Sequence, residues 1–146
     1  MKNTWVIVAK ADQAKIYALE HQPRSLVLIT QFEHPESRLK KNELLETEDG
    51  HHDSTGSPRG NASYHSNAKR NEHTTFAMQI EEFLEQSYHQ RKFEELILIA
   101  EPFFHGFLNG KLAKPLQKII NKHIQKNYID KDETELLRII FAKPDY

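Results

Sequence analysis

Cysteine is absent from the 146-residue chain, which excludes disulfides, thiolate nucleophiles and thiolate metal ligands. Long hydrophobic runs are absent too. The apolar run near the N-terminus covers only residues 5–9, which is shorter than the core of about 7–15 residues in a signal peptide. No run approaches the roughly 20 apolar residues of a membrane span. We therefore expect a cytoplasmic protein with no membrane partner.

A clear excess of charge of either sign is also missing. The chain has 20 Lys and Arg against 21 Asp and Glu, a net charge of −1 with histidine neutral, which gives no general attraction to nucleic acid or membranes. Nine histidines make this balance depend on pH, since free histidine gains its proton near about pH 6.5. The length and the hydrophobic content of 38% fit one globular domain, residues 1–146.

Three short strands are expected in the first 33 residues. Residues 5–9 are apolar throughout, as in a strand covered on both faces. Residues 14–20 alternate in polarity, and residues 25–33 carry a third apolar stretch. Tight turns separate the three segments, which indicates an antiparallel meander. The apolar residues 96–100 predict a fourth, buried strand that pairs parallel with the first.

Three helices are expected after residue 70. Pro102 opens the second helix, Pro115 ends or kinks it, and Asp132 with Glu135 forms a capping box for the third. The inward positions repeat at helical spacing: Phe76, Ile80, Phe83, Leu84 and Ser87; then Phe104, Phe107, Leu108 and Leu112; then Leu136, Leu137, Ile140 and Phe141. The solvent face of the first helix is expected to be Glu81, Glu82, Glu85 and Gln86.

Residues 119–128 fit two interpretations. We predict a fifth strand, because a helix after Pro115 would leave the sheet without a fifth member; the alternative is a helix through Leu116, Ile119, Ile120 and Ile124. The fold class is then α/β, with the order βββ-loop-αβαβα and helices packed on a five-stranded mixed sheet. Right-handed crossovers give the strand order 3-2-1-4-5, the ribonuclease H-like arrangement.

A long polar loop is predicted at about residues 34–70, opened by the sequence FEHPESR at residues 32–38. A structureless connection of this length is unusual in a compact domain and is normally functional or disordered. Residues 54–71 contain no acid and three bases, and residues 103–129 contain no acid and five lysines. Lysine runs of this kind either form a solvated face or bind phosphates. The bases are Arg59, Lys69 and Arg70 in the first segment, and Lys111, Lys114, Lys118, Lys122 and Lys126 in the second.

Catalytic patterns are missing from the sequence. His51 and His52 are neighbours, and neighbouring side chains of an extended segment point in opposite directions, so they rarely bind one metal ion. The serines near these histidines have no nucleophile-elbow sequence around them. The carboxylates that two-metal nuclease chemistry would need stand apart, at Asp12, Glu20, Glu33 and Glu101. We therefore predict no catalytic residue, no metal and no cofactor.

The FEHPESR segment itself has two interpretations. In one, it anchors the base of the loop, with Pro35 stiffening the exit from the third strand. In the other, His34 and Arg38 face a ligand at the root of the loop. An Arg38→Ala variant separates the two by its effect on stability or on binding.

Together these segments resemble the bacterial host attachment proteins. The resemblance covers nearly the whole chain, and FEHPESR is its most specific part. The other matching segments are Trp5-Val-Ile-Val-Ala9, Asp12, Ala14-Lys-Ile-Tyr17, Leu39-Lys40, Asp49-Gly-His51, the helix around Phe76, and residues 96–100 with Pro102, Gly106 and Leu108.

The host attachment proteins look related in fold to the middle domain of archaeal and eukaryotic translation release factors. That domain carries a Gly-Gly-Gln tip between its third strand and its first long helix. The same slot in this chain holds Gly56-Ser-Pro-Arg-Gly60, which lacks the glutamine.

The resemblance implies a non-enzymatic domain that engages the ribosome or tRNA through its loop. The residues expected to bind the ligand or RNA are His34, Arg38, Arg59, Tyr64, Lys69 and Arg70. One alternative is a hydrolase that uses loop histidines such as His51 or His65 as acid and base. Another is a protein-interaction module involved in attachment to host cells. The sequence leaves the oligomeric state open.

Overall fold

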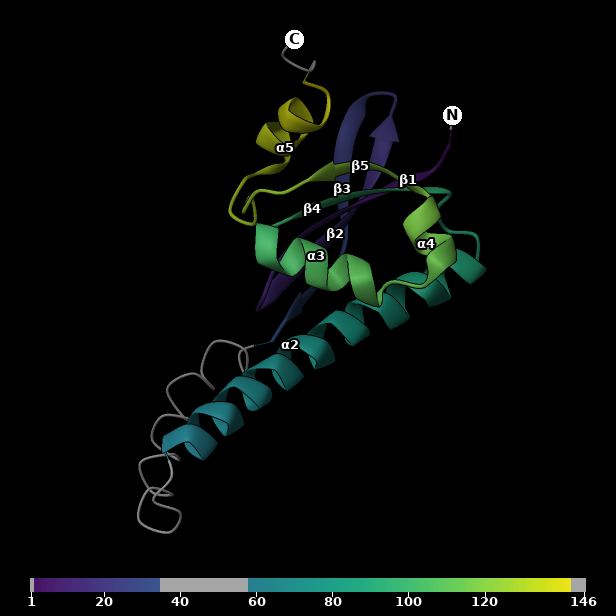
Figure 1. Ribbon diagram of the computed structural model, residues 1–146. Coiled ribbons are helices and arrows are strands. Elements are labelled where there is room, and N and C mark those ends of the chain that lie inside the picture. The colour runs from purple at the N-terminus through teal and green to yellow at the C-terminus, as the bar shows by residue number, and fades with distance from the viewer. Residues whose placement is uncertain (1, 35–57, 143–146) are drawn as a thin grey trace.

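The computed structural model describes residues 2–34 and 58–142, and for residues 58–71 it describes the backbone. Its centre is a five-stranded sheet in the order β3-β2-β1-β4-β5 (Figure 1). This confirms the predicted α/β class and strand order. The strands are β1 (Thr4–Lys10), β2 (Gln13–His21), β3 (Arg24–Glu33), β4 (Glu95–Ala100) and β5 (Ile120–Ile124).

The sheet is mixed, and β1 lies at its centre. β1 pairs antiparallel with β2 and parallel with β4, where Ile7 lies opposite Leu98. β4 in turn pairs parallel with β5. Both β1 and β4 are buried on their two faces, as an unbroken apolar run predicts.

Helices cover both faces of the sheet. On one face, α2 (Pro58–His89), α3 (Pro102–Lys111) and α4 (Lys114–Lys118) lie over a cluster that includes Ile7, Ile80 and Phe104. On the other face, α5 (Glu133–Ile140) packs through Leu136 and Ile140 on Val6, Val8, Ile97 and Ile99. No helix in the described ranges combines the length and apolar character that crossing a membrane requires.

The predicted loop at about residues 34–70 is wrong from Pro58 onward, where α2 begins. α2 has 32 residues, about 48 Å at 1.5 Å per residue, and it projects well beyond the sheet (Figure 1). The sequence of its first half has no apolar stripe because this part of the helix does not lie on the sheet. A segment without such a stripe can therefore still be helical. Proline also favours the first helical turn.

The two interpretations of residues 119–128 are resolved in favour of a strand, since β5 covers Ile120–Ile124. Pro115, which was expected to end or kink the preceding helix, instead lies in the first turn of a separate short helix, α4. Half of the predicted capping box is confirmed: the Asp132 Oδ1 accepts a hydrogen bond from the Glu135 N–H at 2.9 Å, whereas the Glu135 carboxylate accepts a hydrogen bond from Arg138 at 2.8 Å.

Two side chains were assigned to the wrong environment. Glu81 is 5% exposed rather than on the solvent face, and its Oε2 accepts a hydrogen bond from the Ala113 N–H at 3.1 Å. Burial raises the pKa of this carboxyl, and the Ala113 N–H opposes that rise. Phe141 is 37% exposed rather than inward, and the Arg24 guanidinium lies 3.8 Å from its ring centre.

Candidate functional site

The carboxyl ends of β1, β3 and β4 lie at the same end of the sheet, and we call the surface there the carboxyl edge. There the Glu101 N–H donates to the Ala9 carbonyl at 3.1 Å, and the His34 N–H donates to the Asp12 carbonyl at 2.9 Å. The packed part of α2 and the start of α3 reach the same edge. In α/β sheets, ligands bind preferentially outside the carboxyl ends of parallel strands.

His34 fixes the point where the chain leaves β3. Its Nε2 lies 2.8 Å from the Glu72 carboxylate of α2, and its ring stacks on Phe76 with 5.4 Å between ring centres. The residue is 8% exposed. These contacts hold the end of β3 against α2, so the anchoring interpretation describes His34 better than the ligand-facing one.

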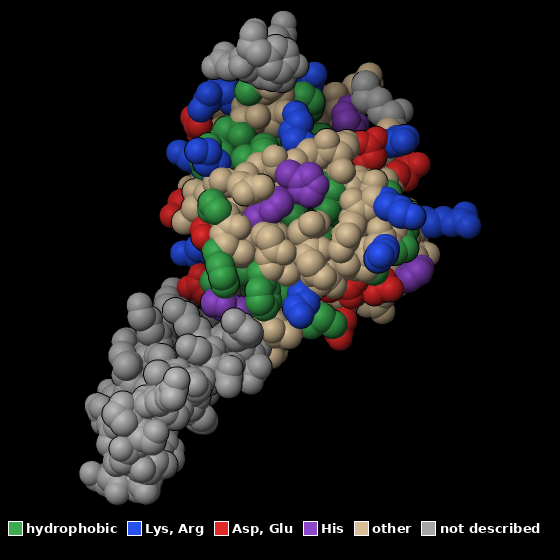
Figure 2. All heavy atoms as spheres, viewed as in Figure 1, with side chains coloured by type: hydrophobic (Ala, Val, Ile, Leu, Met, Phe, Trp, Pro, Cys, Tyr) green, Lys and Arg blue, Asp and Glu red, His purple; other side chains and the backbone are tan. Residues whose placement is uncertain are grey.

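Three rings at this edge form what we call the aromatic patch: His73 of α2 with Phe103 and Phe107 of α3. The His73 ring meets Phe103 and Phe107 edge-on, at centre distances of 5.8 and 6.1 Å. Phe103 stacks on Phe107 with an interplanar angle of 23°, and it is 62% exposed. The face drawn in Figure 2 shows hydrophobic and histidine side chains together at the surface.

The N-terminus of α3 sets the orientation of this patch. The Glu101 carboxylate accepts hydrogen bonds from the N–H groups of Phe103 and Phe104, at 3.0 and 3.1 Å, and so caps the helix. Phe104 and Leu108 are then buried. Phe107 is one turn after Phe103, so the two rings are neighbours on α3; Phe107 is partly buried against the core and Phe103 is exposed.

Lysines follow the aromatic patch along the chain. The Lys111 Nζ lies 5.5 Å from the Phe107 ring centre, and Lys114 and Lys118 are exposed on α4. Lys122 is used differently, since its Nζ donates to the Ile140 carbonyl at 2.6 Å. Not all five lysines of this acid-free segment therefore serve one surface.

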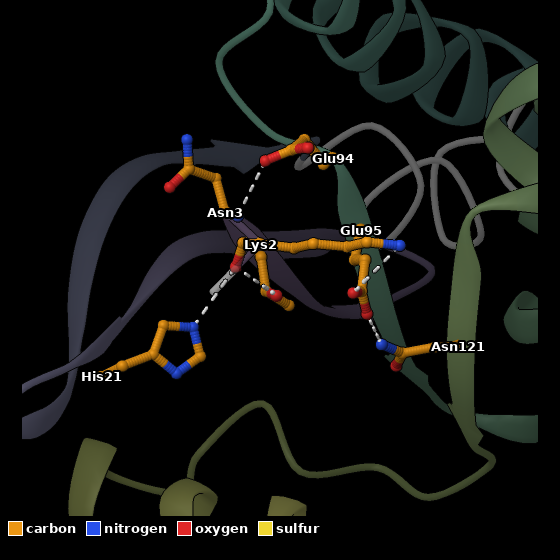
Figure 3. A network of polar contacts seen from close by, with 7 residues as sticks. Lys2, Asn3, His21, Glu94, Glu95 and Asn121 are labelled. Carbon is orange, nitrogen blue, oxygen red and sulfur yellow. Dashed lines mark hydrogen bonds and ion pairs between the residues drawn. The ribbon is translucent and has the colours of Figure 1, made fainter.

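The opposite end of the sheet, where β1 begins, is held together by polar contacts (Figure 3). The His21 Nε2 and the Lys2 carbonyl lie 3.3 Å apart, and the Asn3 N–H donates to the Glu94 carboxylate at 3.3 Å. Glu95 contacts the Lys2 Nζ at 3.9 Å and accepts a hydrogen bond from the Asn121 side chain. These contacts link β1, β2, β4 and β5, so the polar residues at this end of the sheet have a structural role.

The predicted site residues are not brought into one loop. His34 lies at the root, Arg38 lies outside the described residues, and Arg59, Tyr64, Lys69 and Arg70 all fall within α2. Along a helix, positions 59 and 70 are about 17 Å apart. The prediction missed His73, Phe103 and Phe107. The sequence does contain one signal for the aromatic patch: Phe103 is an aromatic residue outside the inward-facing positions of its predicted helix.

The carboxylates considered for nuclease chemistry have separate uses. Glu101 caps α3 and Asp12 lies 3.7 Å from the Lys10 Nζ, whereas Glu20 lies opposite Ser25 in the β2–β3 ladder, toward the other end of the strands. In the described parts of the chain, no three metal-binding side chains come together. His51, His52 and the serines beside them lie outside the described residues.

The fold and the residues at the carboxyl edge define a mixed α/β protein in which a long helix projects beyond the sheet, next to an aromatic patch. The family described as "Protein required for attachment to host cells" matches residues 5–140, so the chain belongs to this family. It is also similar to the uncharacterized protein RP470 of Rickettsia prowazekii (strain Madrid E). The two are 29% identical over 133 residues, which cover 90% of this chain and 83% of that protein.

Proposed function

We propose that this host-attachment-family protein is a non-enzymatic domain that engages the translation machinery, ribosome or tRNA, by binding unpaired RNA. The aromatic patch is the observation that carries the proposal. Phe103 is 62% exposed and stacks on Phe107, and the Lys111 ammonium lies 5.5 Å from the Phe107 ring centre. Exposed rings beside cations are the surfaces on which unpaired bases stack, and each stacked base contributes about 1–3 kcal/mol.

Phosphate contacts would come from the basic side chains near the patch. Residues 103–129 contain no acid, so Lys111, Lys114 and Lys118 meet a backbone phosphate without a competing carboxylate in their own segment. Arg59, Lys69 and Arg70 belong to the sequence of α2 and are the further basic residues that we propose for phosphate contact. An RNA strand that reaches both groups would run from the patch along the projecting helix.

The proposal includes a relation in fold to the middle domain of the release factors. α2 follows β3 through residues 35–57, the slot in which that domain carries its Gly-Gly-Gln tip. The sequence contains no Gly-Gly-Gln, so we propose contact with the translation machinery without peptide release. This part rests on the resemblance of the sequence and on the order of the elements.

Binding of a fluorescent single-stranded RNA and of tRNA across a salt series tests the proposal. Phe103→Ala is expected to weaken binding by about 5- to 150-fold, which corresponds to the loss of one stacked base. Lys111→Ala together with Lys114→Ala is expected to flatten the logarithmic salt slope by about 1.4, since each phosphate contact on a single strand contributes about 0.7. Met78→Ala, which removes an equally apolar side chain 39% exposed on α2, is the control.

A Lys69→Ala, Arg70→Ala double variant asks whether α2 takes part, and a similar flattening is expected. Ribosome capture from lysate with and without nuclease then identifies the RNA source. If the wild type does not bind at low salt, or binds equally after Phe103→Ala, the proposal fails and a protein-interaction module is the better description.

A further inference from the structure

β3 forms one outer edge of the sheet, and within the described residues it pairs only with β2 (Figure 1). It is 10 residues long, and between Arg24 and Glu33 it contains no charged residue, proline or glycine. The outer backbone N–H and C=O groups of such a strand are ready to pair with another strand. Proteins normally protect edges of this kind with charges, prolines or short strand length.

The middle of β3 is apolar and open to solvent. Val27, Leu28 and Ile29 are 48%, 45% and 41% exposed, although they are consecutive residues of a strand. Successive side chains of a strand point to opposite faces, so both faces of this edge are apolar. The strand also has a bulge here: Tyr17 pairs with Leu28 and Ile16 with Thr30, which leaves Ile29 without a partner in β2.

The other edge of the sheet has the expected protection. β5 is only 5 residues long, and Asn121, Lys122 and His123 at its centre are exposed and polar. β3 has neither this short length nor polar residues at its centre, and the bulge at Ile29 is the edge-protecting feature that it does have.

We infer that β3 pairs antiparallel with β3 of a second copy across a two-fold axis, which joins the two sheets edge to edge. Charge favours this partner and this direction. Arg24 opens the strand and Glu33 closes it, so antiparallel pairing brings the basic end of each copy beside the acidic end of the other. Parallel pairing would bring like charges together. A two-fold contact uses the same patch on both copies, as Val27, Leu28 and Ile29 allow.

Sedimentation velocity of the full chain over a dilution series tests this inference. The wild type is expected to be a dimer that dissociates on dilution. Leu28→Lys is expected to weaken the dimer by about tenfold or more, since it places one lysine from each copy in the contact. Met78→Lys, at an apolar position 39% exposed on α2, is expected to leave the dimer unchanged. Thermal unfolding shows that each variant is folded.

Charge reversal tests the direction of pairing independently. Glu33→Arg and Arg24→Glu are each expected to weaken the dimer several-fold, and the two changes together are expected to restore it. Glu33→Arg is the cleaner single change, because Arg24 also contacts Phe141 within its own chain. A wild type that stays monomeric at about 100 μM, or a dimer indifferent to Leu28→Lys and to both reversals, would overturn the inference.

Discussion

His105 of α3 and His123 of β5 touch directly, with 3.0 Å between the His105 Nε2 and the His123 Nδ1. His105 is 6% exposed, whereas His123 is exposed. A hydrogen bond between two ring nitrogens needs one donor and one acceptor, so it is lost when both rings are protonated. Burial lowers the pKa of His105, and the neighbouring His123 lowers it further.

This contact predicts a loss of stability in mild acid. The unfolded state, in which the histidine pKa is about 6.5, binds more protons than the folded state until the pH falls below the lowered folded pKa of His105. The contribution of His105 to the free energy of unfolding is therefore fully present above about pH 6.5 and is lost as the pH falls through that folded pKa. Urea unfolding at about pH 7.5 and about pH 5.5 should show the loss in the wild type.

The matched variants are His105→Gln, which removes the titrating group, and His89→Gln, which changes an exposed histidine of α2. The first should be less sensitive to pH than the wild type, and the second should behave like it. An unchanged pH dependence in His105→Gln would assign the loss to other groups.

Glu81 marks a limit of sequence analysis at the residue scale. Its helical spacing puts it among the polar residues of α2, and that spacing carries no information about the turn between α3 and α4. That turn crosses the helix and leaves the Ala113 N–H in need of an acceptor, which Glu81 provides. A partner 32 residues away in the sequence decides the burial of this side chain.

At the scale of elements, the sheet followed from the sequence because each strand carries its own signal. β1 and β4 are apolar on both faces, and the three-strand meander has turn residues between its strands. α2 could be predicted only where it lies on the sheet, around Phe76 and Ile80. The backbone of its polar first half projects beyond the sheet (Figure 1), and Phe103 is exposed at the aromatic patch; a periodic pattern encodes neither feature.

The central position of β4 predicts a large effect for a single truncation there. Ile97 is 4% exposed between β1 and β5, and Ile97→Ala should lower the free energy of unfolding by about 2–5 kcal/mol, because a cavity remains where the side chain was. Met78→Ala, at a position 39% exposed, should cost less than about 1 kcal/mol. Urea unfolding of both variants checks this. Equal losses would mean that the core is not centred on β1 and β4.

At the scale of the whole molecule, the nearly balanced charge hides an uneven distribution. The net charge is −1 with histidine neutral, yet residues 103–129 contain no acid. Nine histidines can add positive charge in mild acid. At high pH the carboxylates elsewhere in the protein would repel a bound RNA. At low pH the protonated histidines would attract it.

RNA affinity should accordingly rise between about pH 8 and about pH 6, since an unperturbed histidine is half-protonated near about pH 6.5. The salt slope should steepen over the same range as more cations face the phosphates. Fluorescence titrations of the single-stranded RNA at both pH values measure the two quantities. His73→Gln removes the one histidine of the aromatic patch and should keep most of the pH response, because the effect belongs to the whole charge distribution. A response that disappears in this variant would place it in the patch, and equal wild-type affinity at both pH values would exclude a role for histidine charge in RNA binding.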